Sequence, residues 1–204
     1  MKILGIGKNY VESADQISEN KTGHQIIFSK PASSLVTDNK DVVFPSITEN
    51  LIYEAELVVK IGKTGKDIAL ADANGYISEI AIGIDFTAKD VLGESRDKKG
   101  PWDLAKGFDG AAPISAFKPV ADFADLTNIN FDLKINDKPL QDGNTSLMIY
   151  NFADIIAHVS KFMTLEPGDL IFTGTPAVGV GQTFKGDHLQ ASIEGELLLD
   201  FKMV

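Results

Sequence analysis

The chain has 204 residues, and its 19 basic and 29 acidic side chains give a formal net charge of −10. That balance argues against nucleic-acid binding, which requires a basic face. Cysteine is absent, so disulfides, thiolate zinc sites and a Cys nucleophile are excluded. No apolar run reaches the roughly 20 residues of a membrane helix, and the apolar start is too short for a signal peptide. We therefore expect a single cytoplasmic domain over residues 1–204, without a membrane or nucleic-acid partner.

Short runs rich in β-branched and aromatic residues predict strands along most of the chain. The predicted strands cover residues 2–7, 25–28, 56–61, 77–86, 131–135, 170–173 and 189–202. Asn136-Asp137 and Glu194-Gly195 have turn chemistry and predict two hairpins. Strands and helices do not alternate regularly, as they would in a doubly wound fold, so the pattern favours a strand-dominated α+β fold.

Two helices are predicted. Apolar residues at the i, i+3, i+4 spacing of a buried helix face run from Phe152 to Phe162, with Asn151 as the N-cap. A shorter helix is expected over residues 67–74, with Gly75 ending it. Both are short, which fits a fold made mainly of sheets.

Two carboxylates share one face of a predicted strand. Alternate residues from Tyr53 to Ile61 are apolar, which places Glu54 and Glu56 together on the opposite face, about 7 Å apart along the strand. Like charges at that spacing repel unless they are solvated or bridged by a cation. The segment by itself favours a solvated outer face of an antiparallel sheet, and a cation site is the alternative.

A third carboxylate follows another predicted strand. Ala81, Gly83 and Asp85 alternate with apolar residues, and the two small residues leave room beside the carboxylate. Asp85 could instead cap a helical segment over residues 87–92. With no Cys or His nearby, a site made of these carboxylates would suit Mg²⁺ or Mn²⁺.

Several motifs together resemble the fumarylacetoacetate hydrolase family, specifically its small acylpyruvase-like and oxaloacetate-decarboxylase-like members. Each motif is weak alone, but they occur in the same order along nearly the whole chain. They are residues 7–10 (GKNY), 28–31 (FSKP), 53–57 (YEAEL), 83–90 (GIDFTAKD), 101–108 (PWDLAKGF), 135–141 (INDKPLQ), 167–169 (PGD), 173–176 (TGTP) and 179–181 (GVG).

The resemblance implies a mixed β-sandwich roll with a few short helices, assembled as a homodimer. It implies one Mg²⁺ or Mn²⁺ ion at Glu54, Glu56 and Asp85, and a small 2-oxo acid as substrate. Lys106 is implied as a catalytic and substrate-binding residue. Other implied substrate contacts are Thr175, Lys89, Tyr10 and Gln141.

The chain departs from the family where the catalytic base is expected. The family has a His three residues after the Tyr of the Asn-Tyr motif and a Glu three residues further on, whereas this chain has Ser13 and Gln16. Glu12 and His24 lie in the same segment and are the candidate replacements. The family resemblance also implies that residues 11–23 form a lid, and Lys89 stands where the family usually has Arg.

The resemblance makes metal-dependent hydrolysis of a C–C bond in acylpyruvate or fumarylacetoacetate-like 2-oxo acids the expected activity, through a stabilised enolate. Oxaloacetate decarboxylase or tautomerase activity is an alternative, as is isomerisation of 2-hydroxyhepta-2,4-diene-1,7-dioate. A metal-binding protein with weak or no turnover is the alternative from another class.

Two further expectations concern single residues. Trp102 is expected to pack in the core, and Arg96 is expected to lie in a solvated loop.

Overall fold

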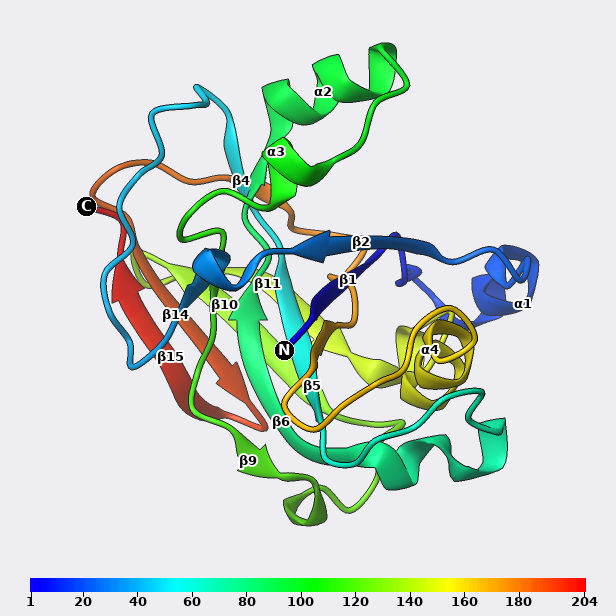
Figure 1. Cartoon of the computed structure of the whole chain (residues 1–204). Coiled ribbons are helices and arrows are strands. Elements are labelled where there is room, and N and C mark those ends of the chain that lie inside the picture. Colours follow the sequence, from blue (N-terminus) through cyan, green and yellow to red (C-terminus); the bar gives the residue numbers. More distant parts are fainter.

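The computed structural model describes residues 1–204, and a six-stranded mixed sheet forms its centre (Figure 1). The strand order is β2-β1-β12-β5-β6-β9, and β1 and β12 are parallel while the other neighbours are antiparallel. The strands are β1 (Ile3–Gly7), β2 (Ile26–Lys30), β5 (Ala55–Ile61), β6 (Ile77–Ile84), β9 (Lys118–Pro119) and β12 (Leu170–Phe172). These bounds confirm most of the predicted strands to within one or two residues.

A second, antiparallel sheet has the order β11-β10-β14-β15. Its strands are β10 (Asn130–Ile135), β11 (Lys138–Asn144), β14 (His188–Ile193) and β15 (Glu196–Lys202). Both predicted hairpin turns are confirmed: the two residues of each turn have positive φ, at 51° and 64° for Asn136 and Asp137. The apolar faces of β10, β14 and β15 pack with those of β5 and β6 in one cluster, so the two sheets form a sandwich.

Short elements complete the fold. Two small sheets consist of β4 (Leu51–Tyr53), β7 (Thr87–Ala88) and β13 (Gly181–Gln182), and of β3 (Leu35–Val36) with β8 (Ala112–Pro113). The helices are α1 (Ile17–Asn20), α2 (Lys89–Asp97), α3 (Asp103–Lys106) and α4 (Phe152–Val159). Single turns of 3₁₀ helix are η1 (Ala14–Gln16), η2 (Ala32–Ser34), η4 (Val120–Asp122) and η5 (Thr145–Leu147), and η3 (Leu70–Tyr76) is longer. None of the helices has the length and apolar character needed to cross a bilayer.

Helix α4 begins as predicted and ends earlier. Asn151 accepts a hydrogen bond from the Asp154 backbone N–H, and the Asp154 carboxylate accepts one in return, which completes a capping box. The expectation that Phe162 continues the buried face is wrong, because the helix ends at Val159 and Phe162 is 69% exposed. After Val159 the backbone turns, so the 3.6-residue period no longer applies to Phe162.

The predicted helix over residues 67–74 is instead the 3₁₀ helix η3, over Leu70–Tyr76. Asp67 has a φ of 51°, so the chain is outside the helical region where the helix was expected to begin. Gly75 lies inside η3 and does not end it. Packing against α4 supports this short segment, and Ala73 is its one buried residue.

The outer face of β5 and β6 is buried, which corrects the expectation of a solvated face. Val58 and Ala81 belong to a second apolar cluster on that side, together with Ile3, Ala112, Ile114, Leu170 and Phe172. Leu35 and Phe117 pack against this cluster from outside. Glu56 therefore lies within a buried layer and is only 3% exposed. A carboxylate there requires compensating partners.

Candidate active site

The ends of β4, β5 and β6 bring three carboxylates together. Glu54 occupies the break between β4 and β5, and Asp85 follows the last residue of β6. The antiparallel register pairs Glu56 with Gly83, and the Asp85 backbone N–H donates to the Glu54 carbonyl at 2.8 Å. One ligand oxygen from each of Glu54, Glu56 and Asp85 lies within 4.8 Å of the others. The structure therefore brings the three predicted metal ligands into one cluster.

The two other interpretations of the Asp85 segment are wrong. Asp85 does not cap α2, since Ala88 is the N-cap and makes no side-chain capping bond. Gly83 does not clear space for the carboxylate. A Cβ atom there would lie 2.8 Å from Phe172 Cε1 and 2.9 Å from Ile114 Cγ2, so glycine is needed for the close packing of the second apolar cluster.

Two buried lysines face the carboxylates. Lys106 Nζ lies 2.6 Å from Glu54 Oε2 and 2.5 Å from Asp85 Oδ2, and Lys30 Nζ lies 2.6 Å from Asp85 Oδ1. Lys30 also donates to the carbonyls of Phe86, Lys106 and Ala111. Sequence reasoning did not assign Lys30 to the site. The available signal was a lysine at the end of an apolar strand, inside the FSKP motif.

Burial and charge shift the protonation equilibria of this cluster in different directions. Burial raises the pKa of Glu56 well above its usual range, and the charges of Asp85 and Glu54 raise it further. Burial would also raise the pKa of Asp85, but Lys106 and Lys30 outweigh this effect and lower that pKa. For Lys106, burial would lower the pKa, but the charges of Asp85 and Glu54 outweigh it and raise the pKa. Lys106 therefore carries its proton at neutral pH.

The donor set fits a hard divalent cation. All three groups are carboxylates, which are the ligands that Mg²⁺ and Mn²⁺ prefer. Asp85 Oδ1 is buried and forms an ion pair with Lys30 Nζ at 2.6 Å, so Lys30 holds the carboxylate in place. A cation bound among the three groups would also offset the burial and the mutual repulsion that together keep the pKa of Glu56 high.

A cavity of about 150 Å³ opens beside the carboxylates. That volume is below the roughly 300–1,000 Å³ of pockets for drug-sized ligands, so it suits a molecule of few atoms. Its lining consists of Ile6, Gly7, Lys8, Phe28, Ile52, Glu54, Glu56, Asp85, Thr87, Lys89, Leu92, Arg96, Trp102, Lys106 and Thr175. Arg96 is exposed, as expected, but it lies on α2 at this cavity and not in a loop. Trp102 is half-buried at the same cavity, so it is not a core residue.

The substrate contacts expected from the family resemblance occupy different positions relative to the cavity. Thr175 and Lys89 line it, and Gln141 lies behind Thr175. The Gln141 amide donates to Thr175 Oγ1 at 2.8 Å and accepts from the Ala55 backbone N–H at 2.9 Å, so it ties Thr175 to β5. Tyr10 is buried outside the lining, its hydroxyl has no hydrogen-bond partner, and its ring packs edge-on against Phe131.

Asn9 is a second residue that sequence reasoning missed. Its amide donates to the carbonyls of Tyr150 and Thr173, at 2.9 and 2.8 Å, and accepts from the Tyr150 backbone N–H. Gly174 lies directly against it with a φ of 102°, and a Cβ atom there would be 2.7 Å from Asn9 Cβ. The Gly174 N–H donates to Glu56 Oε2 at 2.7 Å, so this contact also positions a carboxylate of the cluster.

The two candidate bases, Glu12 and His24, lie outside the cavity. Both are exposed, and neither belongs to the lining. The segment that contains them contacts the α4 region, since Lys21 Nζ lies 2.7 Å from Asp154 and the Gly23 N–H donates to the Tyr150 hydroxyl. The other two histidines are also elsewhere: His158 is on α4, and His188 contacts Asp200. No imidazole therefore reaches the carboxylates in this arrangement.

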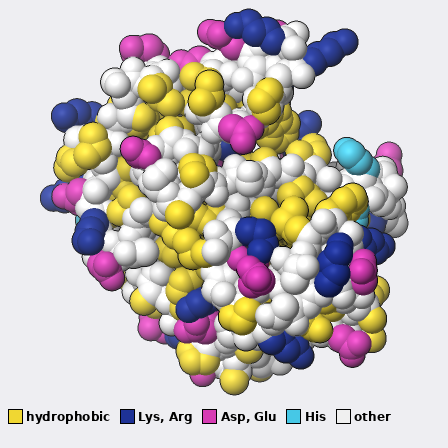
Figure 2. Space-filling model, in the orientation of Figure 1, with side chains coloured by type: hydrophobic (Ala, Val, Ile, Leu, Met, Phe, Trp, Pro, Cys, Tyr) yellow, Lys and Arg dark blue, Asp and Glu magenta, His cyan; other side chains and the backbone are white.

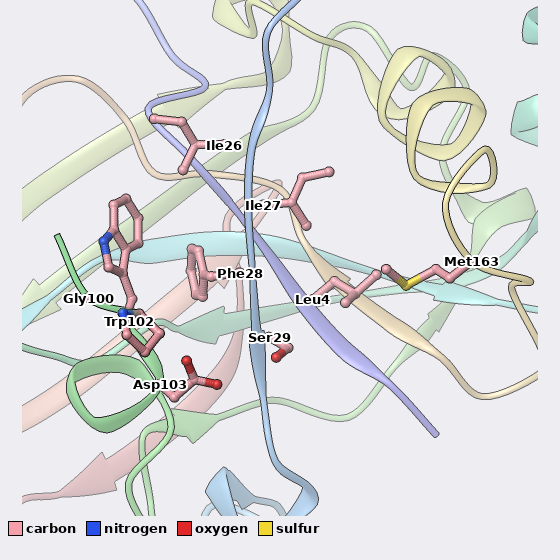
Figure 3. A pocket seen from close by; sticks show the side chains of 10 residues that line it. Leu4, Ile26, Ile27, Phe28, Ser29, Gly100, Trp102, Asp103 and Met163 are labelled. Carbon is pink, nitrogen blue, oxygen red and sulfur yellow. The ribbon is translucent and has the colours of Figure 1, made fainter.

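A second, larger cavity of about 440 Å³ lies along β2 (Figure 3). Phe28 and Trp102 line both cavities, with their ring centroids 6.0 Å apart, so this pair forms the wall between them. Leu4, Ile27 and Met163 lie on the other side of β2 from the two rings (Figure 3). Figure 2 shows a hollow, edged by hydrophobic side chains, between the protruding segment that carries α2 and the segment that carries α1.

Comparisons with known proteins identify relatives of this chain. Residues 2–200 match the family described as Fumarylacetoacetate (FAA) hydrolase C-terminal. The mitochondrial oxaloacetate tautomerase of Bos taurus is 39% identical over 201 residues, which is 98% of this chain and 90% of that protein. The mitochondrial oxaloacetate decarboxylase of Dictyostelium discoideum is 35% identical over 95% of this chain and 89% of its own.

A solved structure extends the likeness to three dimensions. The fumarylpyruvate hydrolase from Pseudomonas aeruginosa in complex with Mn²⁺ and pyruvate is 31% identical and superposes with a TM-score of 0.91, covering 100% of this chain and 89% of that one. The match over nearly the whole chain, the shared fold and the clustered carboxylates lead to one conclusion. The chain belongs to the fumarylacetoacetate hydrolase family.

Proposed function

We propose that the protein is a divalent-metal-dependent enzyme that interconverts the keto and enol forms of oxaloacetate, or of a 2-oxo dicarboxylic acid of similar size. The composition of the small cavity carries this proposal. It contains three carboxylates and four cationic side chains, but no imidazole that could activate water for hydrolysis. The oxaloacetate tautomerase of Bos taurus, similar over nearly its whole length, supports the choice of substrate.

Glu54, Glu56 and Asp85 are the residues that would hold the cation. Bound there, a divalent cation supplies a Lewis acid for the 2-oxo oxygen and the adjacent carboxylate of the substrate. Lys30 fixes the orientation of the Asp85 carboxylate from behind, and the Gly174 N–H fixes that of Glu56. Thr175, held by Gln141, lines the same cavity and would offer its hydroxyl to the same substrate end.

Lys106 supplies the proton for the reaction. Its raised pKa keeps Nζ protonated in the free protein. In the enol-to-keto direction, the enol O–H proton passes to solvent and the resulting enolate accepts the Lys106 proton at C3. The neutral Lys106 then regains a proton from solvent, so the overall reaction balances. The ammonium group would also stabilise the negative charge that develops on the enolate, which lowers the barrier electrostatically.

Hydrolysis of acylpyruvates is the second candidate, because the Pseudomonas aeruginosa neighbour is a fumarylpyruvate hydrolase. It requires a base for water, and Glu12 or His24 could supply one only if residues 11–24 moved over the cavity. Decarboxylation of oxaloacetate is the third reaction to distinguish. It breaks the C3–C4 bond and passes through the same kind of enolate without a base. The isomerase alternative and a protein without turnover remain outcomes of the same test.

The test follows three reactions in parallel on protein stripped of metal and then supplied with Mg²⁺ or Mn²⁺. Loss of the ultraviolet absorbance of enol-oxaloacetate reports tautomerisation, coupled reduction of pyruvate reports decarboxylation, and loss of acetylpyruvate reports hydrolysis. We expect tautomerisation to be fastest, with hydrolysis slower by about 10²–10⁴-fold for want of a base. Lys106→Met should abolish tautomerisation. Lys98→Met is the matched control, since Lys98 is exposed and pairs only with Glu94.

Other outcomes would replace the proposal. Acetylpyruvate loss as the fastest reaction would assign the hydrolase activity, and pyruvate formation at the rate of enol loss would assign the decarboxylase. Metal binding without any turnover would indicate a metal-binding protein that is not an enzyme.

We also propose that the protein is a homodimer and is located in the cytoplasm. Analytical ultracentrifugation and localisation of a tagged chain test these, the second against the mitochondrial location of the relatives.

A further inference from the structure

Helix α2 presents one side to the cavity. Lys89, Leu92 and Arg96 are spaced i, i+3 and i+7, so they share one face of the helix, and all three line the cavity. Lys89 lies at the start of the helix and Arg96 two turns further along. The arginine is the only one in the chain, so the only planar guanidinium fork in the protein lies at this cavity.

Arg96 has no acidic partner in the protein. Its guanidinium carbon lies 4.7 Å from the centre of the Trp102 ring, and it makes no ion pair or side-chain hydrogen bond. Two acidic groups of the same helix are engaged elsewhere: Glu94 contacts Lys98, and Asp90 accepts from Thr48 and the Glu49 N–H. Stacking on the ring orients the fork while leaving its N–H donors available.

The charges of the cavity favour a ligand with two negative groups. The three carboxylates are matched by Lys8, Lys89, Arg96 and Lys106 in the lining, with Lys30 behind the wall, before any divalent cation is added. Lys106 and the carboxylates form one end, where a 2-oxo acid group would bind. Arg96 belongs to a separate element, α2, and its donors remain for a second carboxylate.

We propose that Arg96, stacked on Trp102, binds the distal carboxylate of the substrate and so makes the enzyme selective for dicarboxylic over monocarboxylic 2-oxo acids. This assignment rests on the proposed function, which identifies the 2-oxo acid group as the end of the substrate that reacts. It goes beyond that function by naming the residue that recognises the distal carboxylate. A carboxylate held by both N–H donors of the fork gains charge-assisted, bidentate hydrogen bonds, which a lysine at this position would not reproduce.

Malate and lactate are matched probes for this assignment, because they share a 2-hydroxy acid end and differ in the distal carboxylate. Trp102 is the only tryptophan, so its fluorescence reports ligand binding beside Arg96. With Mg²⁺ present, we expect malate to bind more tightly than lactate. Arg96→Gln should weaken malate binding by about 10- to 100-fold and leave lactate binding unchanged. Arg96→Lys should recover only part of the loss.

The matched control is Lys98→Gln, which removes one positive charge from the same end of α2 outside the cavity and should leave malate binding unchanged. In the kinetic arm, Arg96→Gln should raise the KM for oxaloacetate by the same factor while changing kcat little. Equal malate affinity in wild type and Arg96→Gln, or equal affinity of wild type for malate and lactate, overturns the assignment. Lack of oxaloacetate turnover in the wild type would refute the proposed function alone, since the binding comparison still decides the role of Arg96.

Discussion

Replacing Lys30 by Met tests whether the buried lysine stabilises the carboxylate cluster. The Lys30 side chain is fully buried, and its ammonium lies 2.6 Å from Asp85 Oδ1. The substitution keeps most of the aliphatic volume and removes the charge, which leaves Asp85 with Lys106 as its remaining cation. Breaking a buried ion pair by removing one partner costs about 3–5 kcal/mol. For a chain of this length, that loss corresponds to a fall in Tm of very roughly 6–20 °C.

Metal binding provides a second test with the same variant. A divalent cation bound at Glu54, Glu56 and Asp85 would compensate the charge that Lys30 no longer balances. We therefore expect Mg²⁺ or Mn²⁺ to stabilise Lys30→Met more than it stabilises the wild type.

Urea denaturation followed by circular dichroism, with and without the metal, measures both effects. Lys98→Met, which removes an exposed lysine, is the control and should unfold at the wild-type midpoint. A loss below about 1 kcal/mol in metal-free buffer would refute the reasoning, because exposed pairs already account for changes of that size.

Three further predictions follow from the site and its surroundings. Glu56→Gln should weaken Mn²⁺ binding at least about 10-fold by calorimetry, since a neutral amide replaces a charged ligand; unchanged affinity would remove Glu56 from the ligand set. Ser13→His combined with Gln16→Glu should raise the rate of acetylpyruvate hydrolysis by about 10²-fold or more if residues 11–23 close over the cavity. A rate equal to that of the wild type would indicate that these residues do not close. Burial would raise the pKa of Asp169, but hydrogen bonds from Lys2 and the Glu166 N–H together outweigh it and lower that pKa. The stability from these contacts is therefore present above about pH 4 and is lost as the pH falls through the lowered pKa. Asp169→Asn should therefore destabilise the protein more at pH 7 than at pH 3, and an equal loss at both pH values would contradict the pKa direction.

The local features of the fold were readable from the sequence. The N-cap at Asn151 and the two hairpin turns depend on residues within four positions of one another, so short-range chemistry determines them. The two-residue period placed Glu54 and Glu56 on one strand face, and the family motifs joined them to Asp85. In the structure these three carboxylates do cluster, because each lies at the end of a strand in one antiparallel register.

Long-range packing decided the rest. The outer face of β5 is buried and not solvent-exposed because Ile3, Ala112 and Phe172 pack against it. These residues lie far from residues 52–61 in the sequence, so the pattern of that segment gives no information about them. Lys30 reaches Asp85 from 55 positions away in the chain, and Arg96 reaches the cavity because α2 and Trp102 fold against it. Hydrophobic periodicity indicates which face of its own strand or helix a residue occupies, but not which residues pack against that face. The partners of these two cations, and the absence of any imidazole from the cavity, were therefore decided only by the tertiary structure.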